Sequence, residues 1–151
     1  MAEIFEILVP ATTANLGPGF DCLGLALKLY NRVVVSPANE TRVSIDGHGR
    51  DELPRDAGNL MLRSARELAQ RSGKALPPLA WDAHHDVPLA RGLGSSSTAI
   101  VAGLLAANTV LGLGLPRDEL VRVAAGIEGH PDNVAPALLG GLTLCLPDSD
   151  P

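Results

Sequence analysis

The residues best suited to chemistry lie in the run Pro88–Thr98, which combines glycines with a series of hydroxyls. Gly92 and Gly94 allow a positive φ and a close approach of the backbone to a ligand. The segment that begins at Ser95 predicts a long helix, whose first N–H groups and dipole would favour an anion. The three serines that open this helix could also bind phosphate oxygens or a magnesium ion. The run is therefore typical of a phosphate-binding turn.

This turn differs from the Walker phosphate loop. The Walker loop ends in Gly-Lys-Ser/Thr, and the present sequence contains no lysine after Lys74. A glycine-serine run alone is also typical of linkers and plain helix caps, so the helix pattern that follows is what favours a ligand site. A different phosphate cradle is predicted.

Apolar periodicity predicts the elements that must position this loop. Strands are expected at Glu3–Val9 (ended by Pro10), Leu25–Val35, Thr41–Ile45, Leu79–Val87 and Gly141–Leu146. Helices are expected at Asn59–Ser72, Ser95–Leu111, Pro116–Gly129 and Pro131–Leu139. The strands at 25–35 and 41–45 would form a hairpin, and the residues up to Gly24 a loop. Strands mixed with helices, without a regular βαβ repeat, indicate an α+β fold.

Composition favours one domain over residues 1–151, because the chain has 151 residues and 46% of them are apolar. A formal net charge of −5, with no basic run, argues against a nucleic-acid partner. Cys22 and Cys145 are too few and too far apart in sequence for a disulfide framework, which fits a reducing cytoplasm. No apolar stretch approaches the length of about eighteen residues that a membrane span needs. Small molecules are therefore the expected partners.

Two further segments carry a family resemblance. Residues 10–24 read PATTANLGPGFDCLG, and residues 128–136 read EGHPDNVAP, with Gly140 and Gly141 close behind. Together with PLARGLGSS at residues 88–96, they resemble the motifs of the GHMP kinases and, among these, the homoserine kinases. All three motifs occur in the order that the family uses.

The resemblance implies a GHMP-kinase N-terminal domain, α+β in class, with a left-handed βαβ crossover. It implies phosphorylation of the L-homoserine hydroxyl by ATP in threonine biosynthesis, with Mg²⁺ as the cofactor. It also implies a longer parent protein, whose C-terminal domain is missing from this sequence. A homodimer of that full-length protein is a further implication. That domain would supply the family's second glycine-rich loop.

By the same resemblance, ATP would contact the glycine-rich run and the start of the helix before it. The residues concerned are Pro88, Leu89, Ala90, Arg91, Gly92, Leu93, Gly94, Ser95, Ser96, Ser97, Thr98 and Asn59. Ser95 and Glu128 would hold magnesium, since this ion prefers hard oxygen ligands. Ser95 and Asn59 could instead be helix N-caps, and Glu128 a solvated carboxylate at a helix end.

Asn15, Asp21 and Asp132 would bind homoserine, because a carboxylate suits its ammonium group and an acceptor can orient its hydroxyl. Asn15 and Asp21 could instead stabilise a turn, the usual role of Asn and Asp between glycines. Asp132 could instead cap the short helix expected from Pro131, and Asn133 could order the same turn. These alternatives stay open at the level of sequence.

Other polar residues near the motifs have plainer interpretations. His130 precedes a proline and is interpreted as a structural loop residue rather than a general base. His84 and His85 are neighbours in a predicted strand and would point to opposite faces, which argues against a zinc site. Arg91 could offset phosphate charge or could be an exposed loop residue.

Two rival functions are weighed beside the homoserine kinase hypothesis. Another GHMP small-molecule kinase, such as a mevalonate-type enzyme, is disfavoured by the segment that contains Asn15 and Asp21. A non-catalytic nucleotide- or anion-binding fragment is favoured by the absence of the second glycine-rich loop. Turnover of ATP with and without homoserine would separate these hypotheses.

Overall fold

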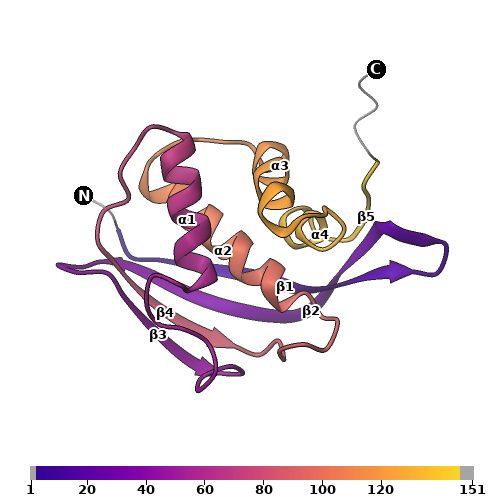
Figure 1. Ribbon diagram of the computed structural model, residues 1–151, viewed down its shortest axis with the longest axis horizontal. Helices are drawn as coiled ribbons and strands as arrows, with labels where there is room; N and C mark the ends of the chain where they lie inside the picture. The colour runs from indigo at the N-terminus through magenta and orange to yellow at the C-terminus, as the bar shows by residue number, and fades with distance from the viewer. Residues whose placement is uncertain (1–2, 147–151) are drawn as a thin grey trace.

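One mixed sheet carries all the helices of the described chain on one of its faces (Figure 1). The computed structural model describes residues 3–146. Its strands are β1 (Phe5–Leu16), β2 (Gly19–Pro37), β3 (Arg42–Gly47), β4 (Leu79–His85) and β5 (Leu142–Leu144). Its helices are α1 (Leu60–Arg71), α2 (Ser95–Val110), α3 (Arg117–Glu128) and α4 (Val134–Leu139). The expected α+β class is confirmed.

The sheet has the order β1-β2-β4-β3, and β5 pairs with β2 near its N-terminal end. β4 therefore lies between β2 and β3, and the predicted hairpin of residues 25–35 with 41–45 is wrong. Most residues of β4 are buried, which suits a central strand, whereas the short β3 forms a parallel edge. Helix α1 connects these parallel strands and so completes a βαβ unit.

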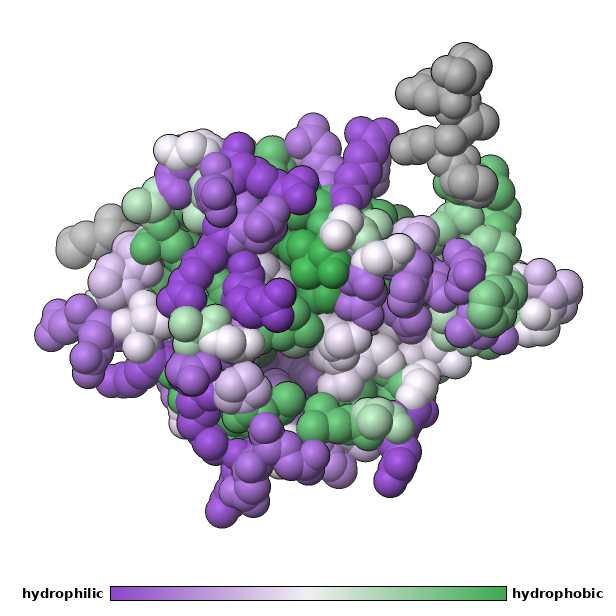
Figure 2. Space-filling model, in the orientation of Figure 1, coloured by the Kyte–Doolittle hydropathy of each residue, from purple (hydrophilic) through white to green (hydrophobic). Residues whose placement is uncertain are grey.

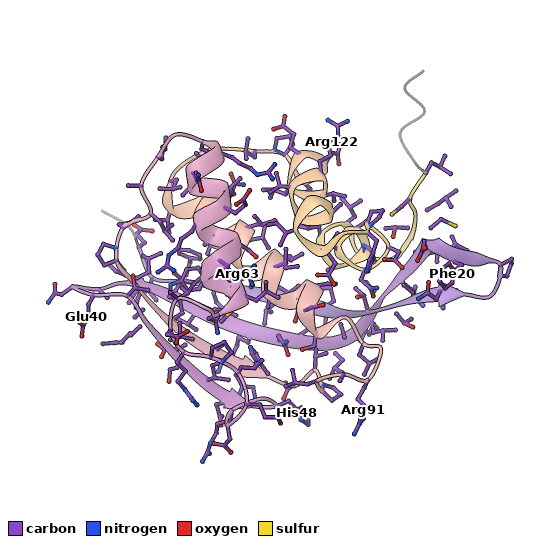
Figure 3. The ribbon with its side chains drawn as sticks, in the orientation of Figure 1. Phe20, Glu40, His48, Arg63, Arg91 and Arg122 are labelled. Atoms are coloured by element: carbon purple, nitrogen blue, oxygen red, sulfur yellow. The ribbon has the colours of Figure 1, made fainter. Side chains whose placement is uncertain are left out.

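β1 and β2 form a long antiparallel hairpin. β1 runs through Pro10 to Leu16, and β2 begins at Gly19, so the predicted strand end and the loop after it are wrong. Pro10 is tolerated because β1 is an edge strand and the ladder shifts register just after this residue. The tip of the hairpin, marked by Phe20, extends past the helices (Figure 3).

Local signals define the helices well. Asn59 caps α1, and its side-chain oxygen accepts a hydrogen bond from the N–H of Met61 at 3.0 Å. Gly129 ends α3 with a φ of 100°. α2 packs closely against α1, since a Cβ at Gly103 would overlap the carbonyl of Met61. α4 begins at Val134, later than predicted, because a turn precedes it.

The core lies between the sheet and the helices above it. Trp81 of β4, Leu68 of α1 and Leu104 of α2 are almost completely buried. Burying a large apolar side chain contributes roughly 1.5–3 kcal/mol. α2 is buried around most of its circumference, which makes it the central helix that the sequence predicts. Within residues 3–146, no helix is long and apolar enough to cross a membrane.

The two cysteines, distant in sequence, lie close together, because Cys22 belongs to β2 and Cys145 directly follows β5, which pairs with β2. The N–H of Cys145 donates to the carbonyl of Cys22 at 2.8 Å, just beyond the β2–β5 ladder. Both thiols are free, as the sequence predicts. Burial raises the pKa of the Cys145 thiol, so this thiol is a poorer nucleophile than an exposed one.

Candidate functional site

A cavity of about 510 Å³ opens where the N-terminal ends of α1 and α2 approach the end of β4. Figure 2 shows it as a hollow on the face that carries these two helix ends. Its lining is mostly apolar, and its volume suits a small-molecule ligand. The lining comprises Leu53, Pro54, Gly58, Asn59, Leu60, Met61, His85, Leu89, Ala90, Arg91, Gly92, Leu93, Ser95, Ser96 and Ala99.

The glycine-rich loop closes one end of this cavity. Gly92 and Gly94 have φ values of 68° and 66°, so both adopt the left-handed conformation that glycine accommodates. Gly94 is the N-cap of α2, and no side chain of the described residues caps this helix end. The N-cap alternative for Ser95 is therefore wrong. The uncapped first turn leaves backbone donors and the positive dipole end for an anion.

Asn31 of β2 holds the loop in place, a role that the sequence analysis missed. Its side-chain oxygen accepts from the N–H of Val87 at 2.9 Å, and its amide donates to the Thr98 hydroxyl at 2.8 Å. The Thr98 hydroxyl in turn donates to the carbonyl of Ser95 at 2.7 Å. Asn31 thus joins the segment before the loop to the first turn of α2. The available signal was an amide side chain that shares one face of the strand with Val33 and Val35.

Thr12 of β1 supports the loop from the other side. Its N–H donates to the carbonyl of Leu93 at 3.1 Å, and its hydroxyl donates to Asn133 Oδ1 at 2.9 Å. A Cβ at Gly94 would overlap the Thr12 hydroxyl. Asn133 therefore has a structural partner here, and Gly94 is required by packing as well as by its φ.

Glu128, the last residue of α3, accepts hydrogen bonds from two hydroxyl groups in the first turn of α2. The Ser96 hydroxyl donates to Glu128 Oε1 at 2.7 Å, and the Ser97 hydroxyl donates to the same oxygen at 3.2 Å. Ser95, the predicted partner of Glu128, lines the cavity together with Ser96, whereas Ser97 and Glu128 lie outside its lining. The structure thus gathers hydroxyl and carboxylate oxygens at the helix end, the ligand type that magnesium prefers.

Asn59 is both a helix cap and a lining residue of the cavity. Its oxygen is used by the N–H of Met61, and its amide donates to the carbonyl of Pro54 at 2.7 Å. The side chain is only 4% exposed. Both of its hydrogen-bonding groups are therefore engaged within the protein, and the N-cap interpretation is confirmed.

The predicted homoserine residues fall into two separate groups. Asn15 and Asp21 lie at the β1–β2 turn with φ values of 59° and 56°, and the N–H of Asp21 donates to Asn15 Oδ1 at 3.3 Å. Asp132 is 1% exposed in the turn before α4, where its carboxylate pairs with His130 Nδ1. No hydrogen bond within residues 3–146 joins the two groups. The structure thus supports the turn interpretation of Asn15 and Asp21.

Other predicted residues divide between the cavity and its surroundings. Pro88, Gly94, Ser97 and Thr98 lie outside the lining, whereas the rest of the predicted ATP-binding residues belong to it. The side chain of Arg91 is exposed and points away from the helices (Figure 3).

The neighbouring histidines lie on opposite faces of the sheet, as predicted. His84 contacts Asp46 at 3.0 Å and Asp86 at 3.2 Å on the open face of the sheet. The pKa of Asp46 is lowered, mainly by a hydrogen bond from the backbone N–H of Gly47 and then by the hydrogen bond with His84. His85 is buried on the helix side. Across the described residues, no cluster of three metal-ligating side chains occurs.

A second cavity, of about 550 Å³, lies between α3, α4 and β5. Leu139, Leu144 and Leu146 contribute to it and are themselves largely exposed. It contains neither the glycine-rich loop nor the N-terminal end of α2. The first cavity is therefore the better candidate for a phosphate-bearing ligand, although the second has a similar volume.

Comparison with known proteins identifies the sequence family. The family model described as GHMP kinases N terminal domain matches residues 59–141. A homoserine kinase of Synechocystis is 49% identical over 97% of this chain and 49% of its own length. A homoserine kinase of Carboxydothermus hydrogenoformans is 50% identical over 95% of this chain and 48% of its own length. The chain therefore spans about half the length of the curated relatives that it matches.

Solved structures agree in fold. A homoserine kinase from Cytophaga hutchinsonii has a TM-score of 0.83 and 31% identity over 95% of this chain and 49% of that one. A mevalonate kinase from Methanococcus jannaschii has a TM-score of 0.71 and 12% identity over 93% of this chain and 53% of that one. The second likeness shows a shared fold alone.

Proposed function

Since the chain belongs to the GHMP kinases, we propose that it serves the ATP-dependent phosphorylation of L-homoserine to O-phospho-L-homoserine, a step of threonine biosynthesis. The observation that carries this proposal is the uncapped N-terminal end of α2, which faces an apolar cavity behind a glycine-rich loop. L-homoserine is proposed as the acceptor of the phosphoryl group because the similar relatives are named homoserine kinases. Residues 1–151 would form one domain of the enzyme.

ATP would lie along this cavity with its phosphates at the glycine-rich loop. The backbone of Gly92 and the first turn of α2 would face the phosphates, because an oxyanion is stabilised by unpaired N–H groups and by the helix dipole. The base would occupy the apolar end, lined by Leu53, Leu60 and Leu89. Asn59 would shape this end through its cap, and its second amide hydrogen and second oxygen lone pair would remain for the base.

Magnesium would be held by Glu128 and by a hydroxyl of the first turn of α2. The donor set fits the ion, because the Ser96 and Ser97 hydroxyls already converge on one carboxylate oxygen. Ser95 was the sequence-based choice, and the hydrogen bonds favour Ser96 as the partner of Glu128. When bound, the ion would offset the charge that develops on the transferred phosphoryl group.

Homoserine would be bound by Asn15, Asp21 and Asp132, the assignment that the family resemblance suggests. The carboxylate of Asp21 remains available, because only the backbone N–H of this residue is used in the turn. Asp132 would act through its pairing with His130, at the edge of the loop that Thr12 and Asn133 support. A homodimer and a cytoplasmic location remain predictions.

In the proposed reaction, the homoserine side-chain oxygen forms a bond to the γ-phosphorus while the bond to the ADP oxygen breaks. The hydroxyl proton leaves to water, and no side chain is assigned as a dedicated base. The contribution of the chain is positioning and charge stabilisation, which are the main terms in phosphoryl transfer.

A panel of acceptors tests this function. Phosphoryl transfer from ATP is measured with L-homoserine, mevalonate and galactose as acceptors, at fixed magnesium. We expect transfer to L-homoserine alone. A clear preference for mevalonate or for the sugar would contradict the proposal. Nucleotide binding with no transfer to any acceptor would favour the non-catalytic anion-binding module.

A further inference from the structure

His85 ends β4 on the helix side of the sheet and lines the nucleotide cavity while being only 5% exposed. Its Nδ1 lies 3.2 Å from the carbonyl oxygen of His48, and the N–H of His48 donates to the His85 carbonyl at 2.8 Å. A carbonyl can only accept, so Nδ1 carries the proton. Two bonds to one neighbour thus fix both the position and the tautomer of the ring.

Burial lowers the pKa of His85, which keeps the ring neutral near neutral pH. A neutral ring with its proton on Nδ1 has a lone pair on Nε2. The hydrogen bonds of residues 3–146 give Nε2 no partner, although the side chain lines the cavity. His85 therefore presents a fixed acceptor rather than a donor.

The surroundings of His85 form the apolar end of the cavity. A Cβ at Gly49, next to His48, would touch both Leu53 and Leu89, so these two leucines converge at the turn that holds the histidine. The other polar side chain at this end is Asn59, whose amide and carbonyl are both engaged. Among the polar side chains of the described residues at this end, Nε2 of His85 is the acceptor atom that has no hydrogen-bond partner within the protein.

We infer that Nε2 of His85 accepts a hydrogen bond from the exocyclic amino group of the nucleotide base and so selects adenine over a base with a carbonyl at that position. This inference rests on the proposed function, because it assumes that the apolar end holds the base. A carbonyl opposite Nε2 would place two acceptors face to face, which leaves both unsatisfied. His85 is thus a specificity-determining residue for the nucleotide.

Binding of ATP and ITP by the wild-type chain tests the inference, because ITP replaces the exocyclic amino group of ATP with a carbonyl and carries a hydrogen on the neighbouring ring nitrogen. Calorimetry gives the ratio of the two dissociation constants. We expect ATP to bind on the order of tenfold more tightly, the usual cost of an unpaired buried polar group.

Two variants separate the acceptor from the structural bond. His85→Asn places its amide where Nδ1 lies and keeps a donor for His48, but it lacks an acceptor at Nε2. His85→Gln places an amide oxygen near Nε2. We expect the ATP preference to vanish in His85→Asn and to persist in His85→Gln. His84→Asn, on the opposite face, is the matched control and should keep the wild-type ratio.

The outcomes are distinguishable. Equal binding of ATP and ITP by the wild type, or an unchanged preference in folded His85→Asn, would overturn the inference alone. If His85→Asn does not fold, the ratio of the ATP and ITP dissociation constants is compared between the wild type and His85→Gln. Loss of the ATP preference in the wild type or in His85→Gln would then overturn the inference. Failure of the wild type to bind either nucleotide would overturn the proposed function and the inference together.

Discussion

The hydroxyl of Ser96 donates to the carboxylate of Glu128 across 2.7 Å and thereby joins the first turn of α2 to the last residue of α3. The contact brings together two segments that lie far apart in the sequence. It also orients a carboxylate toward the end of a helix whose first N–H groups would bind phosphate. Charge and hydroxyl are thus placed where an ATP-bound cation would lie.

The first prediction follows from this contact. Ser96→Ala should weaken the magnesium dependence of ATP binding more than Ser97→Ala, because Ser96 makes the shorter hydrogen bond to Glu128. Glu128→Gln should weaken it on the order of tenfold, since it removes the charge and keeps the shape. Magnesium titrations at fixed ATP measure all three variants. Equal titrations for Ser96→Ala and the wild type would reject this site.

The second prediction distinguishes the two loop glycines. Both have positive φ, so an alanine at either position costs about 1–2 kcal/mol in strain. Only at Gly94 would the new Cβ overlap another group, the hydroxyl of Thr12, whereas the space at Gly92 is open. Urea unfolding should therefore show a larger loss of stability for Gly94→Ala than for Gly92→Ala. An equal or smaller loss for Gly94→Ala would contradict the close packing of Gly94 against Thr12.

The third prediction concerns Asn31. Asn31→Leu removes the partners of the Val87 N–H and of the Thr98 hydroxyl, and buried polar groups left unpaired cost roughly 1–3 kcal/mol each. Unfolding free energy should fall by about that amount, and ATP affinity should fall with it. Asn39→Leu, at an exposed position, is the control, for which we expect a change within about 0.5 kcal/mol. Unaltered stability in Asn31→Leu would contradict the scaffold role.

The fourth prediction isolates the Asp21 carboxylate. Asp21→Asn preserves the backbone N–H that donates to Asn15, so the turn should survive. If the carboxylate binds the ammonium group of homoserine, the homoserine KM should rise roughly ten- to a hundredfold, and the magnesium titration should stay unchanged. A KM equal to that of the wild type would leave Asp21 with the turn role alone.

The fifth prediction is a pH dependence of stability. Burial lowers the pKa of His85 below its ordinary value of 6.5. Above that pH the ring is neutral in both the folded and the unfolded chain. As the pH falls below 6.5, the unfolded chain takes up the proton first, so the free energy of unfolding decreases as the pH decreases. The slope is at most about 1.4 kcal/mol per pH unit. Urea unfolding at pH 7.5 and 5.5 should show a smaller decrease for His85→Gln than for the wild type.

Asp46 provides an internal contrast for this measurement. Its pKa is lowered from 3.8, first by the N–H of Gly47 and then by the His84 side chain. The stability that this carboxylate contributes is therefore lost only at a pH below that value. A difference between His85→Gln and the wild type above pH 5 cannot come from Asp46. Parallel slopes for the two proteins in that range would contradict the buried neutral histidine.

Features set by neighbouring residues could be predicted from the sequence. The helix after Ser95 and the stop at Gly129 were predicted correctly, and the cap at Asn59 was one of two alternatives that the sequence left open, because each depends on residues within one helical turn. The family resemblance also indicated the glycine-rich loop. Local patterns thus located the loop and the helix ends that line the first cavity.

Features that depend on distant partners could not be predicted in the same way. The strand prediction that ended at Pro10 overlooked the tolerance of an edge strand for proline. The contacts of Asn31 with Val87 and Thr98 depend on how the sheet meets α2, which no local pattern encodes. The same holds for the choice among the serines near Glu128, which is set by the rotation of α2 against α3.

The insertion of β4 between β2 and β3 gives the fold a high contact order. β2 ends at Pro37 and β4 begins at Leu79, so a long loop must close before these strands can pair. A nascent chain that has emerged only as far as α1 would expose unpaired strand edges, which are prone to aggregation. Since the loop that follows β4 is tied to Asn31 of β2, this loop can take its final position only in chains that have already paired β4 with β2.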